Sequence, residues 1–188
     1  MKERVSRIYL TGFMGCGKSS IGLILANTLG WKFIDLDDEI IKSEKMSITE
    51  IFKIQGESVF RDIEARELHK MENSNRVIVA LGGGAILRES NIDLMKATGK
   101  LIYIKASPEK IYSRLKLKTN RPLFQTADNL IMTKENAILK IRTMMNEREK
   151  YYLLADLIFS PEDYSIGYCV DKLRAILFKK YGIENAEN

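Results

Sequence analysis

Residues 12–20 read GFMGCGKSS, which fits the phosphate-binding pattern G-x-x-x-x-G-K-[ST]. An apolar run, Ile8–Leu10, precedes this stretch, and a helix-like run, Ile21–Ala26, follows it. A strand, a loop and a helix in this order are the context in which the pattern holds phosphate groups. The sequence therefore predicts a loop that binds a nucleoside triphosphate.

The residue types in this stretch suit that task. Glycines let backbone N–H groups converge on phosphate oxygens, because no Cβ stands in the way. Lys18 supplies a positive charge near the β- and γ-phosphates, and Ser19 offers a hydroxyl to Mg²⁺. The nucleotide-binding residues expected in the loop are Gly12, Gly15, Cys16, Gly17, Lys18, Ser19 and Ser20.

Outward from the loop, short apolar runs rich in β-branched residues alternate with longer segments of helical periodicity. This alternation predicts an α/β fold with a five-stranded parallel sheet that is covered on both faces. The final helix is expected from about Ser165 to Tyr181. The expected strands are Arg7–Leu10, Lys32–Ile34, Val77–Leu81, Leu101–Ile104 and Leu157–Phe159.

Local signals place a helical pair between the second and third expected strands. Ser47 and Glu50 are spaced as a capping box, which predicts a short helix to about Gln55. After Gly56 a second amphipathic helix is expected from Ser58 to about Glu72. Farther along, Ser107-Pro108 predicts the start of another helix.

Composition favours one domain, residues 1–188, because 188 residues with 45% hydrophobic content suffice for one well-buried core. No apolar run approaches the length of a membrane span, so we expect no membrane partner and a cytoplasmic protein. Two cysteines, one of them in the phosphate loop, fit a reducing compartment. The 30 basic residues are interleaved with 25 acidic ones, so we expect a small anionic ligand and no nucleic acid.

Acidic residues gather where the second expected strand ends, in FIDLDDE, residues 33–39. The carboxyl ends of parallel strands form the ligand crevice, so Asp35 and Asp37 should lie beside the phosphate loop. One carboxylate can serve Mg²⁺ and the other can accept a proton from an alcohol. A helix N-terminus decorated with acids explains Asp38 and Glu39 well, and Asp35 less well.

The third expected strand carries no carboxylate and runs directly into Gly82, Gly83 and Gly84. Because this carboxylate is missing, hydrolysis of the nucleotide is less favoured as the main activity. The backbone of the three glycines is exposed, so that its N–H groups can approach a ligand anion. A tight turn is the structural alternative for the glycines, and surface ion pairs are the alternative for Arg61 and Arg148. Arg121 lies in a polar stretch that predicts either a mobile lid over the phosphates or an ordinary surface turn.

Six segments in this order resemble the shikimate kinase family: GFMGCGKSS, FIDLDDEI, GESVFRDIE, ALGGGA, RPLF and NEREKYY. The resemblance extends from about Ile8 to Asp156. It implies a nucleoside-monophosphate-kinase-like three-layer sandwich built on a P-loop. It also implies that ATP and Mg²⁺ are used to phosphorylate the 3-hydroxyl of shikimate on the route to chorismate and the aromatic amino acids.

The resemblance also implies roles for individual residues. Lys18, Asp37 and Arg121 are the implied catalytic residues, with Asp37 as general base. Ser19 and Asp35 resemble the metal site, and Arg114 resembles a basic residue near adenine. The acceptor pocket is implied to contain Asp37, Arg61, Gly82, Gly83, Gly84 and Arg148. The implied substrate-binding helical segment spans about 38–72 and the lid about 114–135, in a protein that we expect to be a monomer.

Two departures from the family pattern bear on these expectations. Cys16 stands where a small residue is more usual, and the nearby helix N-terminus predicts a reactive thiol. The 26 residues between Arg121 and Arg148 are more than the family usually has, which predicts an extended lid. Two alternatives to the function stay open: a kinase of the same fold that acts on gluconate or a nucleoside monophosphate, and a non-catalytic ATP-binding module.

Overall fold

The structure is a computed structural model that describes residues 5–116, 132–161 and 164–183. Its strands are β1 (Arg7–Thr11), β2 (Lys32–Asp35), β3 (Val77–Ala80), β4 (Lys100–Ile104) and β5 (Leu157–Phe159). Its helices are α1 (Lys18–Leu29), α2 (Leu36–Glu44), α3 (Ile48–His69), the 3₁₀ helix η1 (Ala85–Leu87), α4 (Glu89–Thr98), α5 (Pro108–Leu115), α6 (Lys134–Tyr152) and α7 (Ile166–Tyr181). All five expected strands are confirmed.

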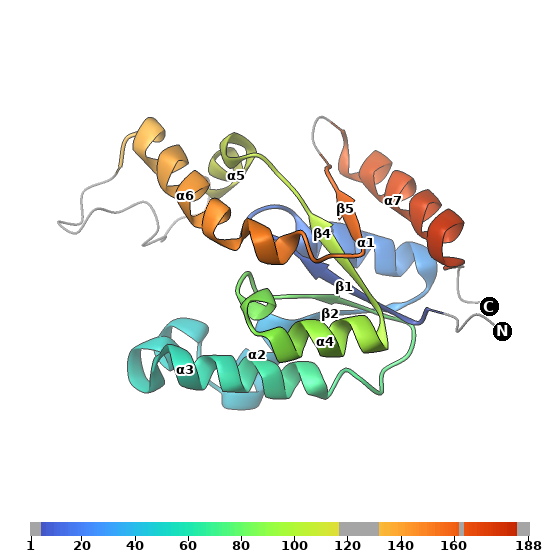
Figure 1. Cartoon of the computed structure of the whole chain (residues 1–188), viewed down its shortest axis with the longest axis horizontal. Helices are drawn as coiled ribbons and strands as arrows, with labels where there is room; N and C mark the ends of the chain where they lie inside the picture. Colours follow the sequence, from blue (N-terminus) through green and yellow to red (C-terminus); the bar gives the residue numbers. More distant parts are fainter. Residues whose placement is uncertain (1–4, 117–131, 162–163, 184–188) are drawn as a thin grey trace.

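The strands form a parallel sheet in the order β2-β3-β1-β4-β5 (Figure 1). In its register, Ala80 of β3 pairs with both Leu10 of β1 and Asp35 of β2. These three strands therefore end at the same level. The segments that follow them, which carry the phosphate loop, the acidic residues and the glycines, begin at one edge of the sheet.

Two hydrophobic cores cover the two faces of the sheet. Successive strand residues point to opposite faces, and Ile8 and Leu10 pack with α1 and α7 while Tyr9 packs with α3 and α4. Burial on both faces explains why the central strands read as continuous apolar runs. The result is the predicted three-layer α/β/α sandwich (Figure 1). None of the described helices is long and apolar enough to serve as a membrane span.

The helical pair α2 and α3 follows the sequence signals closely. Ser47 caps α3 in a complete capping box with Glu50, as predicted. Gly56 takes φ 84° and ψ 172° inside α3, so the two expected helices run on from each other across a kink. The second part ends at His69 and not near Glu72, because the chain turns there through hydrogen bonds from Met71 N to Leu68 O and from Glu72 N to His69 O.

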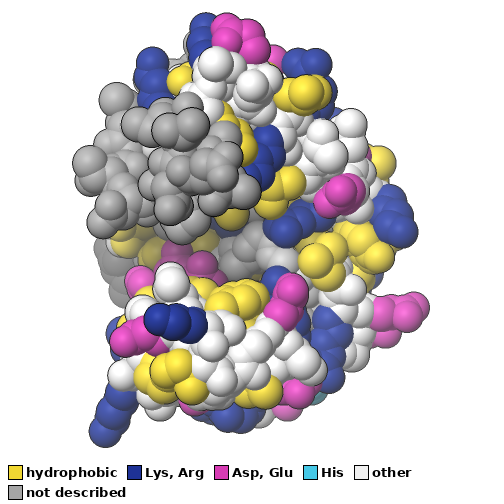
Figure 2. Space-filling view, turned by 90° about the vertical axis from the view of Figure 1, so that its left-hand side faces the viewer, with side chains coloured by type: hydrophobic (Ala, Val, Ile, Leu, Met, Phe, Trp, Pro, Cys, Tyr) yellow, Lys and Arg dark blue, Asp and Glu magenta, His cyan; other side chains and the backbone are white. Residues whose placement is uncertain are grey.

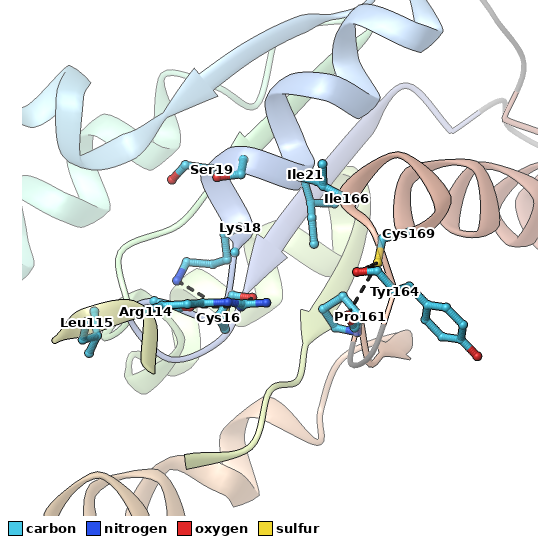
Figure 3. Close-up of a pocket in the computed structure, with 13 residues that line it drawn as sticks. Cys16, Lys18, Ser19, Ile21, Arg114, Leu115, Pro161, Tyr164, Ile166 and Cys169 are labelled. Carbon is cyan, nitrogen blue, oxygen red and sulfur yellow. Dashed lines mark hydrogen bonds between the residues drawn. The ribbon is translucent and has the colours of Figure 1, made fainter. Parts of the chain in front are cut away.

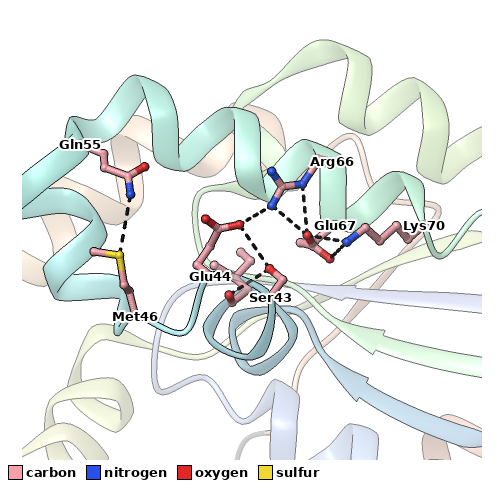
Figure 4. A network of polar contacts seen from close by, with 8 residues as sticks. Ser43, Glu44, Met46, Gln55, Arg66, Glu67 and Lys70 are labelled. Atoms are coloured by element: carbon pink, nitrogen blue, oxygen red, sulfur yellow. Dashed lines mark hydrogen bonds and ion pairs between the residues drawn. The ribbon is translucent and has the colours of Figure 1, made fainter.

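A buried carboxylate links α2 and α3. Glu67 of α3 is only 3% exposed, and its oxygens accept hydrogen bonds from Lys70 at 2.7 Å and from Arg66 at 3.1 Å (Figure 4). Arg66 also donates to Glu44 at the end of α2. Burial raises the pKa of Glu67, but the hydrogen bonds from Lys70 and Arg66 lower it more, so the carboxylate is held ionised.

We expect Glu67→Gln to lower the free energy of unfolding by about 1 kcal/mol, because the amide keeps the shape but loses two charge-assisted hydrogen bonds. Urea denaturation measures this change. Glu72→Gln is the matched control, since the carboxylate of Glu72 is far more accessible than that of Glu67 and lies 3.5 Å from His69. Equal denaturation midpoints for the two variants would show that the buried carboxylate does not stabilise the helical pair.

Candidate active site

The site lies at the carboxyl ends of β1, β2 and β3. Figure 2 shows that the surface is hollowed here, between the α2–α3 pair and the helices α5 and α6. Lysine, arginine, aspartate and glutamate side chains are visible around the hollow. The strand register thus brings the segments chosen from the sequence to one place.

The phosphate loop has the backbone that its glycines predict. Gly12 takes φ 140°, and an added Cβ there would lie 2.5 Å from the carbonyl oxygen of Ile104. Gly17, with φ 111°, is the N-cap of α1. Lys18 is 9% exposed, and its Nζ donates to the carbonyl oxygens of Gly12 at 2.8 Å and Phe13 at 3.3 Å. The ammonium group is therefore held inside the loop whose N–H groups face a phosphate.

A cavity of about 420 Å³ opens beside this loop (Figure 3). Of the nucleotide-binding residues predicted in the loop, all but Gly12 line it. Arg114 lines it too, and its Nη1 donates to the carbonyl oxygens of Cys16 at 2.7 Å and Gly15 at 3.2 Å. Four lining residues across from the loop were not predicted from the sequence: Pro161, Tyr164, Ile166 and Cys169. They come from the first turn of α7 and from the segment before it, and they form no motif in the sequence.

The prediction of a reactive Cys16 is wrong as far as access is concerned. The residue is 1% exposed, and its Sγ lies 3.9 Å from the Lys18 ammonium group. Cys16 packs in the core cluster that contains Phe13 and Leu115. A thiol reagent in solution therefore meets backbone and neighbouring side chains before it meets this sulfur.

Asp35 joins two elements of the site. Its Oδ2 accepts a hydrogen bond from the Ser19 hydroxyl at 2.6 Å, and its Oδ1 accepts one from the backbone N–H of Asp37. Asp35 is therefore the N-cap of α2, a structural role that the sequence favoured less for this residue. The Ser19 hydroxyl and the Asp35 carboxylate are hard oxygen donors, which fits Mg²⁺, an ion that takes few protein ligands beside the phosphates of its nucleotide.

The half-buried Asp37 and the fully buried Glu64 form a pair of carboxylates. An added Cβ on Gly82 would lie 2.7 Å from Asp37 Oδ1 and 2.9 Å from Glu64 Oε1, so both carboxylates face the same point of the glycine turn. Burial, and next the charge of Asp35, raise the pKa of Asp37. Burial also raises the pKa of Glu64 against the opposing effect of Arg61. Within the described part of the chain, Glu64 Oε1 has no hydrogen-bond partner.

Arg61 lies between these carboxylates and the glycine turn. Its guanidinium group donates to Glu64 at 2.8 Å and to Glu57 at 3.1 Å, so the ion-pair alternative raised by the sequence is part of the structure. The same group faces the turn, since an added Cβ on Gly84 would lie 2.5 Å from two of its nitrogens. The ion pairs therefore keep the guanidinium group of Arg61 beside the glycine turn.

Arg148 approaches the turn from the opposite side, on α6. Its Nη1 lies 3.4 Å from the carbonyl oxygen of Gly83, and its guanidinium group stands 5.8 Å from the centre of the Phe13 ring. The structure thus brings Arg61, Arg148 and the glycines together, as predicted. Arg121 and most of the predicted lid lie outside the described residues.

The profile of the shikimate kinase family matches residues 14–176 of this chain, which span the phosphate loop, both carboxylate segments, the glycine turn and both arginines. The chain belongs to the shikimate kinase family. It is a kinase that uses ATP with Mg²⁺.

Individual members of the shikimate kinase family agree with this assignment. A shikimate kinase from Chlorobaculum tepidum is 44% identical over 168 residues, which cover 89% of this chain and 88% of the relative. The crystal structure of shikimate kinase from Bacteroides thetaiotaomicron superposes with a TM-score of 0.83 at 30% identity, covering 92% of this chain and 98% of that one. A shikimate kinase from Acinetobacter baumannii, solved in complex with shikimate, superposes with a TM-score of 0.81 at 32% identity. The match covers 95% of this chain and 96% of that one.

We expect Asp37→Asn to raise the melting temperature at pH 8, by about 2–4 °C if the ionised group costs about 1 kcal/mol. A carboxylate whose pKa is raised by folding destabilises the folded state above that pKa, and the cost disappears as the pH falls below its pKa in the unfolded chain. The gain should therefore fade toward pH 3. Thermal unfolding without nucleotide or Mg²⁺, at both pH values, measures it.

Asp38→Asn is the matched control, because Asp38 is exposed in the same first turn of α2. We expect no gain in melting temperature there, since an asparagine only removes a favourable charge from the helix N-terminus. A gain of the same size in both variants would contradict the assignment of the effect to burial of Asp37.

Proposed function

We propose that this chain transfers the γ-phosphoryl group of ATP to the 3-hydroxyl of shikimate, with the residues at the edge of the sheet in the roles given below. The family of the chain supports the reaction, which is a step of aromatic amino acid biosynthesis. The residue roles are supported by one observation: three groups of residues lie at the same hollow. These groups are the phosphate loop with Lys18, the half-buried Asp37 carboxylate, and the glycine turn between Arg61 and Arg148.

The phosphate loop binds the donor in this proposal. Its N–H groups and the Lys18 ammonium group hold the phosphates of ATP, with the adenine end toward Arg114 in the cavity beside the loop. Ser19 and Asp35 would hold Mg²⁺, which neutralises charge on the phosphate oxygens when it is bound. Because this charge stabilisation is in place before reaction, it does not have to be assembled during transfer.

Asp37 is proposed as the general base. Its raised pKa makes the ionised carboxylate a better proton acceptor than an exposed aspartate. The carboxylate accepts the proton of the attacking hydroxyl as the bond from that oxygen to phosphorus forms. The positive charge of Lys18 acts on Asp37 in the opposite direction, because it favours the ionised form of the carboxylate.

The acceptor pocket is proposed to hold a carboxylate and hydroxyl groups at once. Arg61 and Arg148 approach the glycine turn from two helices, and a planar guanidinium group matches a planar carboxylate. Glu64 and Glu57 fix the position of Arg61 and leave its remaining donors for the acceptor. Asp37, which lies against Gly82 of the same turn, would face the hydroxyls.

The remaining assignments rest on the family resemblance. We propose a single domain over residues 1–188, with the acceptor-binding helices at about 38–72 and a lid at about 114–135. Arg121 is proposed to reach the transferring phosphate from that lid, where it would neutralise developing charge as water is excluded.

We also propose a cytoplasmic monomer. The two cysteines are buried as free thiols, which supports a reducing compartment, and light scattering of the purified protein tests the monomer.

The purified protein with ATP and Mg²⁺ should release ADP in the presence of shikimate, and much more slowly with gluconate, with AMP or with no acceptor. The reason is that the pocket offers paired guanidinium groups for a carboxylate beside one base for a hydroxyl. A coupled ADP assay measures release. ADP release that is fastest with gluconate or AMP would move the acceptor assignment to another kinase of this fold. ATP binding without any transfer would favour the non-catalytic module.

Asp37→Asn should lower kcat by a factor of about 10² to 10⁴, the usual contribution of a general base, while the KM for ATP changes little. Asp38→Asn serves as the control here too, because its carboxylate is exposed in the same first turn of α2. Steady-state kinetics with shikimate at saturating ATP measure both. Near-normal turnover in Asp37→Asn would overturn the assignment of the base.

A further inference from the structure

Tyr152 contacts the glycine turn but has no role in the mechanism described so far. It is the last residue of α6, and its side chain is completely buried. Its hydroxyl donates a hydrogen bond of 3.0 Å to the carbonyl oxygen of Gly83. A buried tyrosine of this kind fixes whatever its hydroxyl binds, because loss of the partner would leave a buried polar group unpaired.

The position of the Tyr152 ring is itself fixed. The ring stacks on Tyr103 of β4, with 4.8 Å between centres and 20° between planes. The Tyr103 hydroxyl donates to Glu149 at 2.9 Å, and Glu149 also pairs with Lys105 at 2.6 Å. The end of α6 is therefore attached to the sheet by a stacked pair whose two hydroxyls point to different partners.

The hydrogen bond from Tyr152 sets the direction of one peptide group. The described residues contain no cis peptide bond, so the C=O of Gly83 and the N–H of Gly84 point in opposite directions. With the carbonyl held toward Tyr152, the N–H of Gly84 points away from it. Gly84 lies against the Arg61 guanidinium group, at the acceptor pocket. In residues 5–116, 132–161 and 164–183, the N–H groups of Gly83 and Gly84 have no backbone partner.

We propose that Tyr152 is a positioning residue, whose hydroxyl orients the Gly83–Gly84 peptide so that the Gly84 N–H donates to the bound acceptor. This inference deepens the proposed function and rests on it. The hydroxyl does so without touching the acceptor itself. Without the tyrosine hydroxyl, the Gly83 carbonyl would keep the longer contact from Arg148, so the peptide group would be less firmly oriented before the acceptor binds.

Arg148 donates to the same carbonyl oxygen at 3.4 Å, and the contact from the tyrosine hydroxyl, at 3.0 Å, is the shorter of the two. The guanidinium group of Arg148 carries further N–H donors, which remain for the acceptor carboxylate. Burial raises the pKa of Tyr152 to about 12, so the hydroxyl keeps its proton and remains a donor throughout the neutral range.

Two substitutions separate this role from general support of the fold. Tyr152→Phe removes the hydroxyl that binds Gly83 and keeps the stacked ring, while Tyr103→Phe removes the other hydroxyl of the same pair. We expect Tyr152→Phe to raise the KM for shikimate about fivefold to tenfold, with the KM for ATP unchanged. Tyr103→Phe should leave both KM values within about twofold of the wild type.

An NMR measurement without any ligand tests the same idea independently of activity. In ¹⁵N-labelled protein, Tyr152→Phe should shift the Gly84 amide resonance, because the carbonyl in its own peptide group loses a hydrogen bond. Tyr103→Phe should leave that resonance in place. An unmoved Gly84 amide in Tyr152→Phe would overturn the positioning role, and so would an equal change of shikimate KM in both variants. Absence of shikimate-dependent turnover in the wild type would instead overturn the proposed function, and the ligand-free spectra would still decide how Gly84 is oriented.

Discussion

The site depends first on the register of the parallel sheet. Because Ala80 pairs with Leu10 on one side and with Asp35 on the other, three strands end level with one another. The backbone hydrogen bonds of the sheet thereby place the phosphate loop, the acidic helix start and the glycine turn within reach of each other. A slip of one residue in β3 would turn its side chains to the other face and break both cores.

Exclusion of water follows from that arrangement and gives the site its electrostatics. Asp37 and Glu64 share one small space, and Arg61 compensates for the charge that burial leaves there. The pKa of Asp37 is raised by this environment, which costs stability but makes its carboxylate a stronger base than one in water. Stability for this cluster comes from elsewhere, including the Glu67 contacts that hold α2 against α3.

The sequence predicted the strands well because each is a short apolar run between helices of clear periodicity. It also predicted the caps at Ser47 and Ser107 and a helix start near Ser165, since capping is a local interaction within four residues. It failed on the thiol of Cys16, because a residue beside a helix N-terminus looks reactive until its burial is known. The lining residues Pro161, Tyr164, Ile166 and Cys169 carry no pattern of their own, so only the folded chain identifies them.

The sequence by itself determined the phosphate loop, the order of strands and helices and the chemical types of the acceptor-site residues, because these follow from local spacing and from motifs. The tertiary structure decided which charges are buried together and which hydroxyl meets which carbonyl. Glu64 reads in the sequence as one surface partner of Arg61 among several, yet it is buried against the glycine turn. Tyr152 is the last residue of NEREKYY in the sequence, and only packing against Tyr103 brings its hydroxyl to Gly83, 69 positions away in the chain. Contacts over such distances depend on how the helices pack on the sheet, which no local pattern encodes.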